Sequence, residues 1–135
     1  MKIEYANKID CQYILDNDKH ISKELIESKI NMNEIIIARN EDNKNIGWLR
    51  YNYFWDNTPF MNMLYLDENY RHKGIGKNLV TFWENEMRHN GYDLVMTSTL
   101  SNESAQHFYR NLGYKDAGSL LIENEPLEII FTKKL

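Results

Sequence analysis

A buried strand, a basic glycine-containing loop and an amphipathic helix follow one another directly in the middle of the chain. Residues 60–66 (FMNMLYL) are apolar apart from Asn62, which is typical of a central strand covered on both faces. Apolar residues then recur at helical spacing over 74–90, and a further strand with Leu94, Val95 and Met96 at its centre is expected over 93–99. A strand, a helix and a second strand within about 40 residues predict a parallel strand pair joined by a right-handed crossover.

The loop between this strand and the helix, RHKGIGK at residues 71–77, has the features of an anion-binding site. The start of a helix leaves about four backbone N–H groups without intrahelical partners and carries partial positive charge. The two glycines let a ligand approach the backbone closely, because neither has a Cβ. Arg71, Lys73 and Lys77 add positive charge where it opposes the helix dipole, a conflict that an acidic ligand relieves. A phosphate-bearing ligand is therefore favoured over the alternative, a solvated basic turn.

Two well-known phosphate-binding patterns do not fit this loop. A dinucleotide fingerprint needs a third glycine where Leu79 stands, and a Walker loop needs Gly-Lys-Ser/Thr, which is absent. What remains is R-x-x-G-x-G at the junction of a strand and a helix.

A second pattern follows the next strand, N-x-x-A-x-x-F-Y-x-x-x-G-Y over residues 102–114. The two patterns in this order resemble the GCN5-related N-acetyltransferase (GNAT) superfamily. The resemblance covers residues 60–114 closely and the N-terminal third only by the order of its elements.

The resemblance implies a single GNAT domain over residues 1–135, of the α/β class. Its sheet is expected to be mixed and twisted, with six or seven strands, helices on both faces and a splay between strands 4 and 5, which are 60–66 and 93–99 here. The remaining strands are expected at 2–5, 34–39, 46–54, 114–122 and 126–132, the last two antiparallel. The remaining helices are expected at 18–30 and from a cap at Ser101 or Asn102 to Gly113.

The resemblance also implies that acetyl-CoA is the co-substrate and assigns residues to it. Strand backbone would bond the pantetheine arm, loop amides would hold the pyrophosphate, and Asn102 would reach one of these two parts. Tyr109 would bind near the thioester sulfur and donate to the leaving thiolate, whereas without the resemblance it reads as a core residue. The strand residues are Leu64, Tyr65 and Leu66, and the loop residues are Arg71, His72, Lys73, Gly74, Ile75, Gly76 and Lys77.

No general base is assigned, because strand 60–66 has no carboxylate. Asp56, Glu125 and Glu128 are candidates, each more typical of a solvated surface acid, and the amine can instead lose its proton to water. An aromatic acceptor slot is expected near Trp48, Tyr51, Tyr53, Trp55 and Phe60, with core packing as the alternative. The four histidines lack the spacing of a metal site, so no metal is expected.

Composition indicates which partners and which cellular location are expected for this protein. The net charge of −4 argues against nucleic acid as a partner, and no apolar run approaches the roughly 18 residues of a membrane span. The N-terminus lacks the apolar segment of a secretory signal, and the lone Cys11 cannot form an internal disulfide, so a cytoplasmic location is expected.

The sequence therefore predicts a GNAT-type N-acetyltransferase that acts on the primary amine of a small molecule. A protein or peptide amine is the second choice of acceptor, and transfer of a longer acyl group or to oxygen is the enzymatic rival. A non-catalytic acyl-CoA-binding sensor is the rival from another class. Many members of the family form dimers, so a homodimer is retained among the expected partners.

Overall fold

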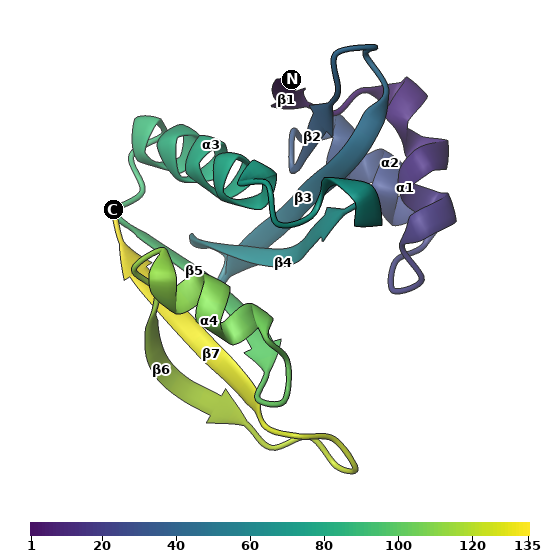
Figure 1. The fold of residues 1–135 in the computed structure, drawn as a ribbon. Coiled ribbons are helices and arrows are strands. Elements are labelled where there is room, and N and C mark those ends of the chain that lie inside the picture. Colours follow the sequence, from purple (N-terminus) through teal and green to yellow (C-terminus); the bar gives the residue numbers. More distant parts are fainter. The chain divides into compact units, whose positions relative to one another are not determined.

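The structure is a computed structural model that describes residues 1–135, and it is an α/β fold with one seven-stranded sheet (Figure 1). The strand order is β1-β2-β3-β4-β5-β7-β6. Strands β4 and β5 pair in parallel, whereas β1 with β2, β2 with β3, β5 with β7 and β6 with β7 pair antiparallel, so the expected mixed sheet is confirmed. The strands are β1 Lys2–Tyr5, β2 Ile35–Arg39, β3 Asn45–Phe54, β4 Thr58–Leu66, β5 Leu94–Leu100, β6 Lys115–Leu120 and β7 Glu128–Lys134. The α-helices are α1 Cys11–Asn17, α2 Lys23–Asn31, α3 Ile75–His89 and α4 Ala105–Asn111.

The chain divides into two compact units. Unit 1 comprises Met1–Tyr51 and Met63–Trp83, and unit 2 comprises Asn52–Asn62 and Glu84–Leu135. Strands β3 and β4 and helix α3 contribute residues to both units. The single domain over residues 1–135 stays a prediction.

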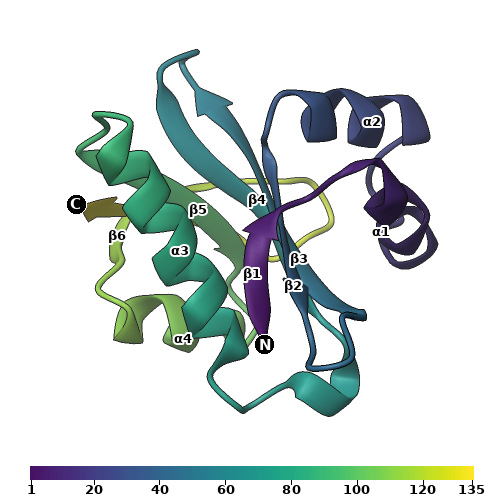
Figure 2. The same cartoon turned by 90° about the horizontal axis from the view of Figure 1, so that it is seen from above.

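In unit 1, helices cover both faces of the sheet. Successive side chains of a strand point to opposite faces, and β3 follows this rule. Trp48 packs edge-to-face on Tyr13 of α1 with ring centroids 5.6 Å apart, whereas Tyr51 lies 5.8 Å from Trp83 of α3. Figure 2 shows α1 and α2 on one side of β1, β2 and β3, with α3 on the other side.

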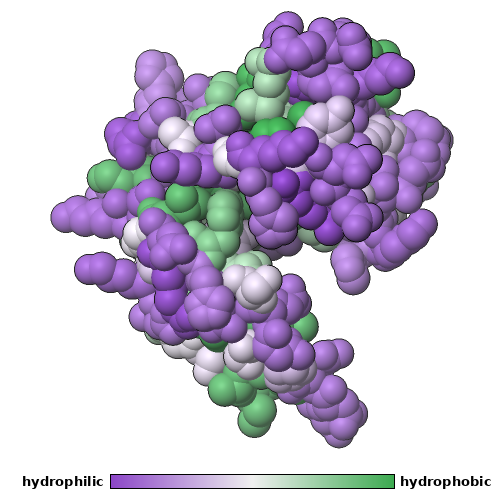
Figure 3. Space-filling view, viewed as in Figure 1, coloured by the Kyte–Doolittle hydropathy of each residue, from purple (hydrophilic) through white to green (hydrophobic).

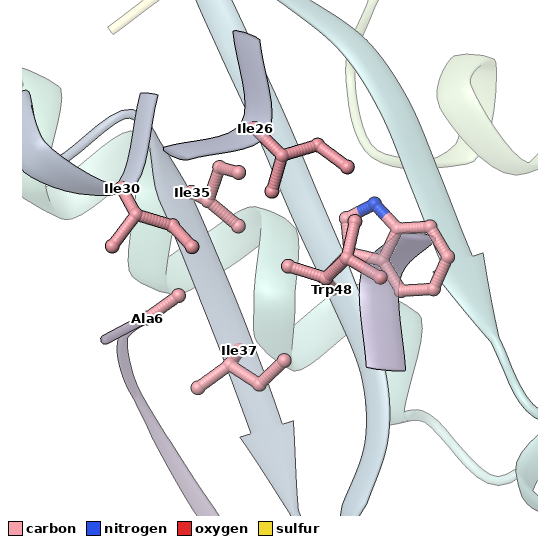
Figure 4. Packing of buried hydrophobic residues seen from close by; sticks show 7 residues of the cluster. Ala6, Ile26, Ile30, Ile35, Ile37 and Trp48 are labelled. Carbon is pink, nitrogen blue, oxygen red and sulfur yellow. The ribbon is translucent and has the colours of Figure 1, made fainter. Parts of the chain in front are cut away.

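The face beneath α1 and α2 holds a core built largely from isoleucine (Figure 4). β-branched side chains pack well on a pleated surface, and full burial of one isoleucine stabilises the fold by about 1.5–3 kcal/mol. The cluster consists of Ala6, Ile14, Ile26, Ile30, Ile35, Ile37 and Trp48.

Unit 1 also buries charged side chains, each with a partner. Arg39 Nη1 donates to Asp10 Oδ1 at 2.7 Å, and Arg50 Nε donates to Asp18 Oδ2 at 2.9 Å. Burial acts to raise the pKa of Asp10, but hydrogen bonds from Arg39, the Asn7 amide and Asn45 outweigh it and hold the pKa below its usual range. These pairs satisfy charges that would be costly to bury alone.

Unit 2 is built on β5, β7 and β6, with α4 against one face. Tyr109 of α4 lies 5.7 Å from Tyr114 and 6.1 Å from Phe131, measured between ring centroids. The Tyr114 hydroxyl donates to buried Glu84 at 2.7 Å, and Lys133 Nζ donates to the same carboxylate at 3.0 Å. Burial and the neighbouring charge of Glu84 raise the pKa of Tyr114 well above its usual range, so this phenol stays a hydrogen-bond donor.

The parallel ladder between β4 and β5 is short. Its registered pairs are Phe60 with Met96 and Met61 with Thr97, and the Thr97 hydroxyl donates to the Met61 carbonyl at 2.9 Å. Beyond this point β4 continues to Leu66 without a further registered pair to β5. The registered pairing of β4 with β5 therefore lies within unit 2, and the expected splay between strands 4 and 5 stays a prediction.

One predicted helix is wrong in its extent. Instead of a helix over residues 18–30, α1 ends at Asn17 and α2 begins at Lys23. Asp18 between them has an extended backbone, and its carboxylate accepts from the His20 amide as well as from Arg50. The Ser22 side chain then caps α2 by accepting from the Leu25 amide at 3.2 Å.

The predicted start of the helix observed as α4 is also wrong. Helix α4 begins at Ala105, after Ser104, rather than directly after a cap at Ser101 or Asn102, and Ser104 makes no side-chain capping bond. The Gln106 side chain donates instead to the carbonyls of Ser101 and Glu103, at 2.8 and 2.9 Å. These bonds hold the preceding residues in a turn that the helix does not include.

Candidate active site

The loop between β4 and α3 is fixed at its beginning. The Asp67 amide donates to the Ile46 carbonyl at 2.8 Å, and the Asp67 carboxylate accepts from the Tyr13 hydroxyl at 2.7 Å. Close packing of β3 beside the end of β4 also fixes the start of the loop. A Cβ on Gly47 would lie 2.5 Å from the Tyr65 carbonyl oxygen and 2.6 Å from a Leu66 methyl carbon. The loop thus starts from a rigid strand end in unit 1.

Beyond this anchor the backbone amides of residues 72–77 make no hydrogen bond to acceptors of the chain. The first amide of this helix start to find a partner is that of Asn78, which donates to the Gly74 carbonyl at 3.1 Å. His72 and Gly74 have positive φ values of 62° and 84°, and a Cβ on Gly74 would meet no atom within 4 Å. The amides at this helix start are therefore open to a ligand, and they fit an anionic group such as a pyrophosphate.

The basic side chains of the loop lie against aromatic rings. Arg71 Nε donates to the Leu66 carbonyl at 2.9 Å, and its guanidinium carbon is 5.8 Å from the Tyr65 ring centroid. Lys73 Nζ is 5.7 Å from the Tyr70 ring centroid. Both cations are solvent-exposed, so they can turn toward an anion without breaking a buried pair.

The side chain of Tyr65 belongs to the packing of unit 1. Its ring stacks on Trp48 with centroids 4.4 Å apart, and its hydroxyl donates to Asn17 Oδ1 at 3.3 Å. Only the backbone of Tyr65 is thus available for the role that the family resemblance implies.

Tyr109 and Asn102 lie in unit 2. Tyr109 is 7% exposed, and burial raises its pKa to about 12, with a smaller opposing effect of the hydrogen bond with Thr97 and a further raising by the charge of Glu103. This phenol is protonated at neutral pH and can donate a proton or a hydrogen bond. Asn102 is exposed in the turn between β5 and α4. The predicted site residues thus form one set in unit 1, residues 64–77, and a second set in unit 2.

Unit 2 also contains a hollow of about 380 Å³, within the usual size range of ligand pockets. Its aromatic wall consists of Tyr53, Phe54, Trp55 and Phe60, and Leu120 and Ile130 add aliphatic surface. Three polar residues, Asn52, Asn62 and Ser98, complete it.

Three of the five residues expected in an aromatic acceptor slot line this hollow, and its role as an acceptor site stays a prediction. Tyr53, Trp55 and Phe60 line the hollow, but Trp48 and Tyr51 are core residues of unit 1, because α1 covers one and α3 the other. Asn52, Phe54 and Ser98 also line the hollow but were not predicted for any site. The alternation of β3, which puts residues 52 and 54 on one face, was the signal available for two of them.

The three candidate bases do not line this hollow. Asp56 and Glu125 are exposed in turns, and Glu128 is half-buried at the start of β7. The polar groups that face the hollow are therefore uncharged.

A second hollow, of about 340 Å³, lies in unit 1 between Lys8, Cys11, Glu27, Ile30 and Asn31. Burial raises the pKa of the Cys11 thiol, the charge of Glu27 raises it further, and that of Lys23 lowers it slightly. The protonated thiol is the poorly nucleophilic form of cysteine, so Cys11 is not a candidate nucleophile.

Sequence comparison identifies the family of the chain. The profile of the "Acetyltransferase (GNAT) family" matches residues 4–114. The chain belongs to this family. The recognition made from the two motifs is confirmed, as is the enzyme class, acyltransferase (EC 2.3.1.-).

Solved structures share the fold of this GNAT protein. A GNAT-family acetyltransferase from Bacillus cereus is 24% identical with a TM-score of 0.79, over 98% of this chain and 96% of that one. The yncA protein from Salmonella typhimurium, described with its cofactor acetyl-CoA, is 16% identical with a TM-score of 0.80, over 100% and 92%. A ribosomal-protein-alanine N-acetyltransferase from Brucella melitensis is 18% identical with a TM-score of 0.80, over the whole of both chains. No curated protein matches the sequence significantly.

Two further observations concern this GNAT protein as a whole. No group of three or more His, Cys, Asp or Glu side chains is arranged so that it could hold a metal ion. None of its helices has the length and apolar character needed to cross a membrane.

Proposed function

We propose that this GNAT protein transfers the acetyl group of acetyl-CoA directly to the primary amine of a small molecule. The observation that carries the proposal is the helix start after β4, where the amides of residues 72–77 have no partner in the chain and Arg71, Lys73 and Lys77 add positive charge. A pyrophosphate would satisfy these amides and remove the conflict between the basic residues and the helix dipole. The acetyl-CoA described with the yncA protein supports the same co-substrate.

The remaining roles follow the family pattern. Backbone groups of Leu64, Tyr65 and Leu66 would bond the pantetheine arm as an added strand does, and Asn102 would contact that arm or the phosphates. The arm would compete with Arg71 for the Leu66 carbonyl, since that guanidinium already donates to it.

Few side chains take part in the proposed reaction. A neutral amine forms a new C–N bond with the thioester carbonyl, whose oxygen takes up negative charge that a strand amide stabilises. The C–S bond breaks, and Tyr109 donates a proton or a hydrogen bond to the thiolate, which its raised pKa of about 12 allows at neutral pH. The amine loses its proton to water. Holding the amine beside the thioester contributes much of the remaining acceleration.

The test combines cofactor binding with turnover. Acetyl-CoA should bind in calorimetry, and thiol release should require an added amine. Binding without thiol release from any amine would favour the non-catalytic sensor, and absence of binding would overturn the loop assignment. Reaction with peptides but not with small amines would favour the second acceptor class, which the name of the Brucella melitensis neighbour illustrates.

Comparison of acetyl-CoA with longer acyl-CoA esters in the same assay would test the acyl group. We also propose a cytoplasmic location, which suits a chain whose one cysteine, Cys11, is a free thiol.

A further inference from the structure

Resting on the proposed function, we infer that the hollow in unit 2 binds the body of the acceptor. We further infer that this acceptor is a primary amine attached to a planar, uncharged, apolar group.

The hollow lies where the ladder between β4 and β5 ends. The last registered pair is Met61 with Thr97, and the next residues of the two strands, Asn62 and Ser98, both line the hollow. An amine at this end of the hollow would therefore stand where the two strands stop pairing.

The hollow and Tyr109 belong to opposite faces of the β5–β7 pair. Tyr109 lies against Phe131 and interacts with Thr97, whereas the next residues of the ladder, Ser98 and Ile130, line the hollow. Adjacent residues of a strand point to opposite faces. An acceptor in the hollow would thus approach from the face opposite the group proposed to assist the leaving thiolate, as direct transfer requires.

The walls of the hollow favour a flat apolar ligand. The Phe54 ring lies 4.6 Å from Trp55 at 49° and 6.2 Å from Phe60 at 31°, measured between centroids. Trp55 is 77% exposed with a φ of 56°, so a large aromatic side chain is held in solvent on a backbone conformation that such residues rarely adopt. A bound aromatic group would cover this surface and gain both burial and ring stacking.

The hollow lacks a carboxylate, which disfavours ligands with a second positive charge. Its polar side chains are two amides, the Ser98 hydroxyl and the Tyr53 phenol, none of them a carboxylate, so a second ammonium group would be desolvated without a counter-ion. Diamines and polyamines are therefore poor acceptors for this site.

The two amides provide a place for the amine itself. Asn62 Nδ2 donates to Asn52 Oδ1 at 2.6 Å and to the Phe60 carbonyl at 3.4 Å. Asn62 Oδ1 remains available as an acceptor and can take an N–H of the incoming amine. This bond would orient the nitrogen lone pair without adding charge.

The experiment compares phenethylamine with ethylamine and putrescine in the acetyl-CoA thiol-release assay. Phenethylamine should have a kcat/KM about 10- to 100-fold above that of ethylamine, because the ring fills an apolar pocket, and putrescine should be no better than ethylamine. Trp55→Gly and Phe60→Ala should bring the ratio of phenethylamine to ethylamine close to one. Glycine suits the positive φ at position 55, so folding should be retained there.

Two further variants make the test specific. Asn62→Leu should lower kcat/KM for phenethylamine and ethylamine alike and leave their ratio unchanged. Leu121→Ala, at an apolar residue that is 87% exposed and outside the hollow, should change neither rate nor ratio. A wild-type ratio near one, or a ratio that survives both Trp55→Gly and Phe60→Ala, would overturn the inference.

A binding measurement separates failure of this inference from failure of the proposed function. If acetyl-CoA binds but no amine is acetylated, the transferase proposal fails, and phenethylamine is titrated against tryptophan fluorescence. Trp48 and Trp83 are fully buried, so a saturable change that disappears in Trp55→Gly would report the hollow and support the inference. No saturable change would overturn it.

Discussion

Unit 1 and unit 2 differ in how far the faces of their strands are covered. In unit 1 helices cover both sheet faces, and the buried cations Arg39, Arg50 and Lys29 are each paired with a carboxylate. In unit 2 helix α4 packs against one face of the β5–β7 pair, while the opposite face carries the aromatic hollow, and every residue of β6 is exposed. Figure 3 shows hydrophobic side chains at the lower end of unit 2, near the end of β6, where Leu120 and Leu121 are exposed.

Two tryptophans show what this difference means. Trp48 is fully buried beneath α1, whereas Trp55, in the turn directly after β3, is 77% exposed beside the hollow. An aromatic residue of this segment is thus buried where a helix packs over it and exposed beside the hollow. The following predictions test this division between residues buried under helices and the open face that we propose binds the acceptor.

The largest effect is expected from breaking a buried ion pair in unit 1. Arg39→Met leaves the carboxylate of Asp10 buried without its main partner and should lower the free energy of unfolding by about 3–5 kcal/mol. Urea denaturation measures this loss. The double variant with Asp10→Leu should recover most of it, and a loss below about 1 kcal/mol in the single variant would argue against a structural role for the pair.

Tyr109→Phe in unit 2 should lower kcat by about 100-fold, since the phenol is proposed to donate to the leaving thiolate. Acetyl-CoA affinity and folding should change little, because the ring packing on Tyr114 and Phe131 is kept. In the wild type, the pKa of about 12 predicts no alkaline fall in rate from Tyr109 through the pH range of normal assays. Full turnover by the variant would remove Tyr109 from the mechanism.

Charge reversal in the loop between β4 and α3 tests whether this exposed part of unit 1 binds the cofactor. Lys73→Glu with Lys77→Glu should weaken acetyl-CoA binding by about 10- to 30-fold, or roughly 1.4–2 kcal/mol, because phosphate charge loses its partners. Gly76 is buried, so a bulky substitution there would test folding as well, whereas both lysines are exposed. Lys44→Glu with Lys115→Glu, also at exposed positions, is the matched control in calorimetry.

Acid pH should lower the free energy of unfolding, because the carboxylate of Asp10 becomes protonated. Its folded pKa lies below the unfolded value, so its contribution is present above the unfolded pKa of about 3.9 and is lost as pH falls through the folded pKa. Asp10→Asn should therefore flatten the decline of stability at acid pH, at the cost of lower stability near neutrality. Unfolding followed by circular dichroism between neutral and acid pH provides the measurement, and an unchanged acid slope would contradict the assignment.

The smallest effect is expected at Trp55. Trp55→Gly should change the free energy of unfolding by no more than about 0.5 kcal/mol, because the indole is largely exposed. The matched change at the buried tryptophan, Trp48→Ala, should cost about 3–5 kcal/mol. Similar thermal shifts for both would remove the distinction between the two units.

Much of this architecture is predictable from local signals. The unbroken apolar run of β4, the glycines after it and the helical periodicity of α3 identify the central strand–loop–helix segment, and two spaced motifs identify the family. Helix α1 was missed, because seven residues that include Gln12 and Asp16 give no clear apolar stripe. Trp48, which α1 covers, was therefore expected to face a ligand. Tyr51 lies under the predicted helix α3, but its contact with Trp83 is a long-range one that the periodicity of either segment does not show.

The lining of the hollow could be predicted only in part. Asn52 and Phe54 share a face of β3 by simple alternation, but Ser98, Leu120 and Ile130 join them only through the register of three other strands. Such register depends on long-range pairing, which local periodicity does not encode.

The close approach at Gly47 has a consequence for genetic experiments. Any side chain at this position would displace the end of the neighbouring strand, and with it the loop that follows, although Gly47 is not a predicted ligand contact. In a saturation-mutagenesis screen for activity, Gly47 should tolerate almost nothing and score alongside the glycines of the loop. A map of the positions that tolerate no substitution would then include residues that hold the loop in place as well as residues that contact the cofactor.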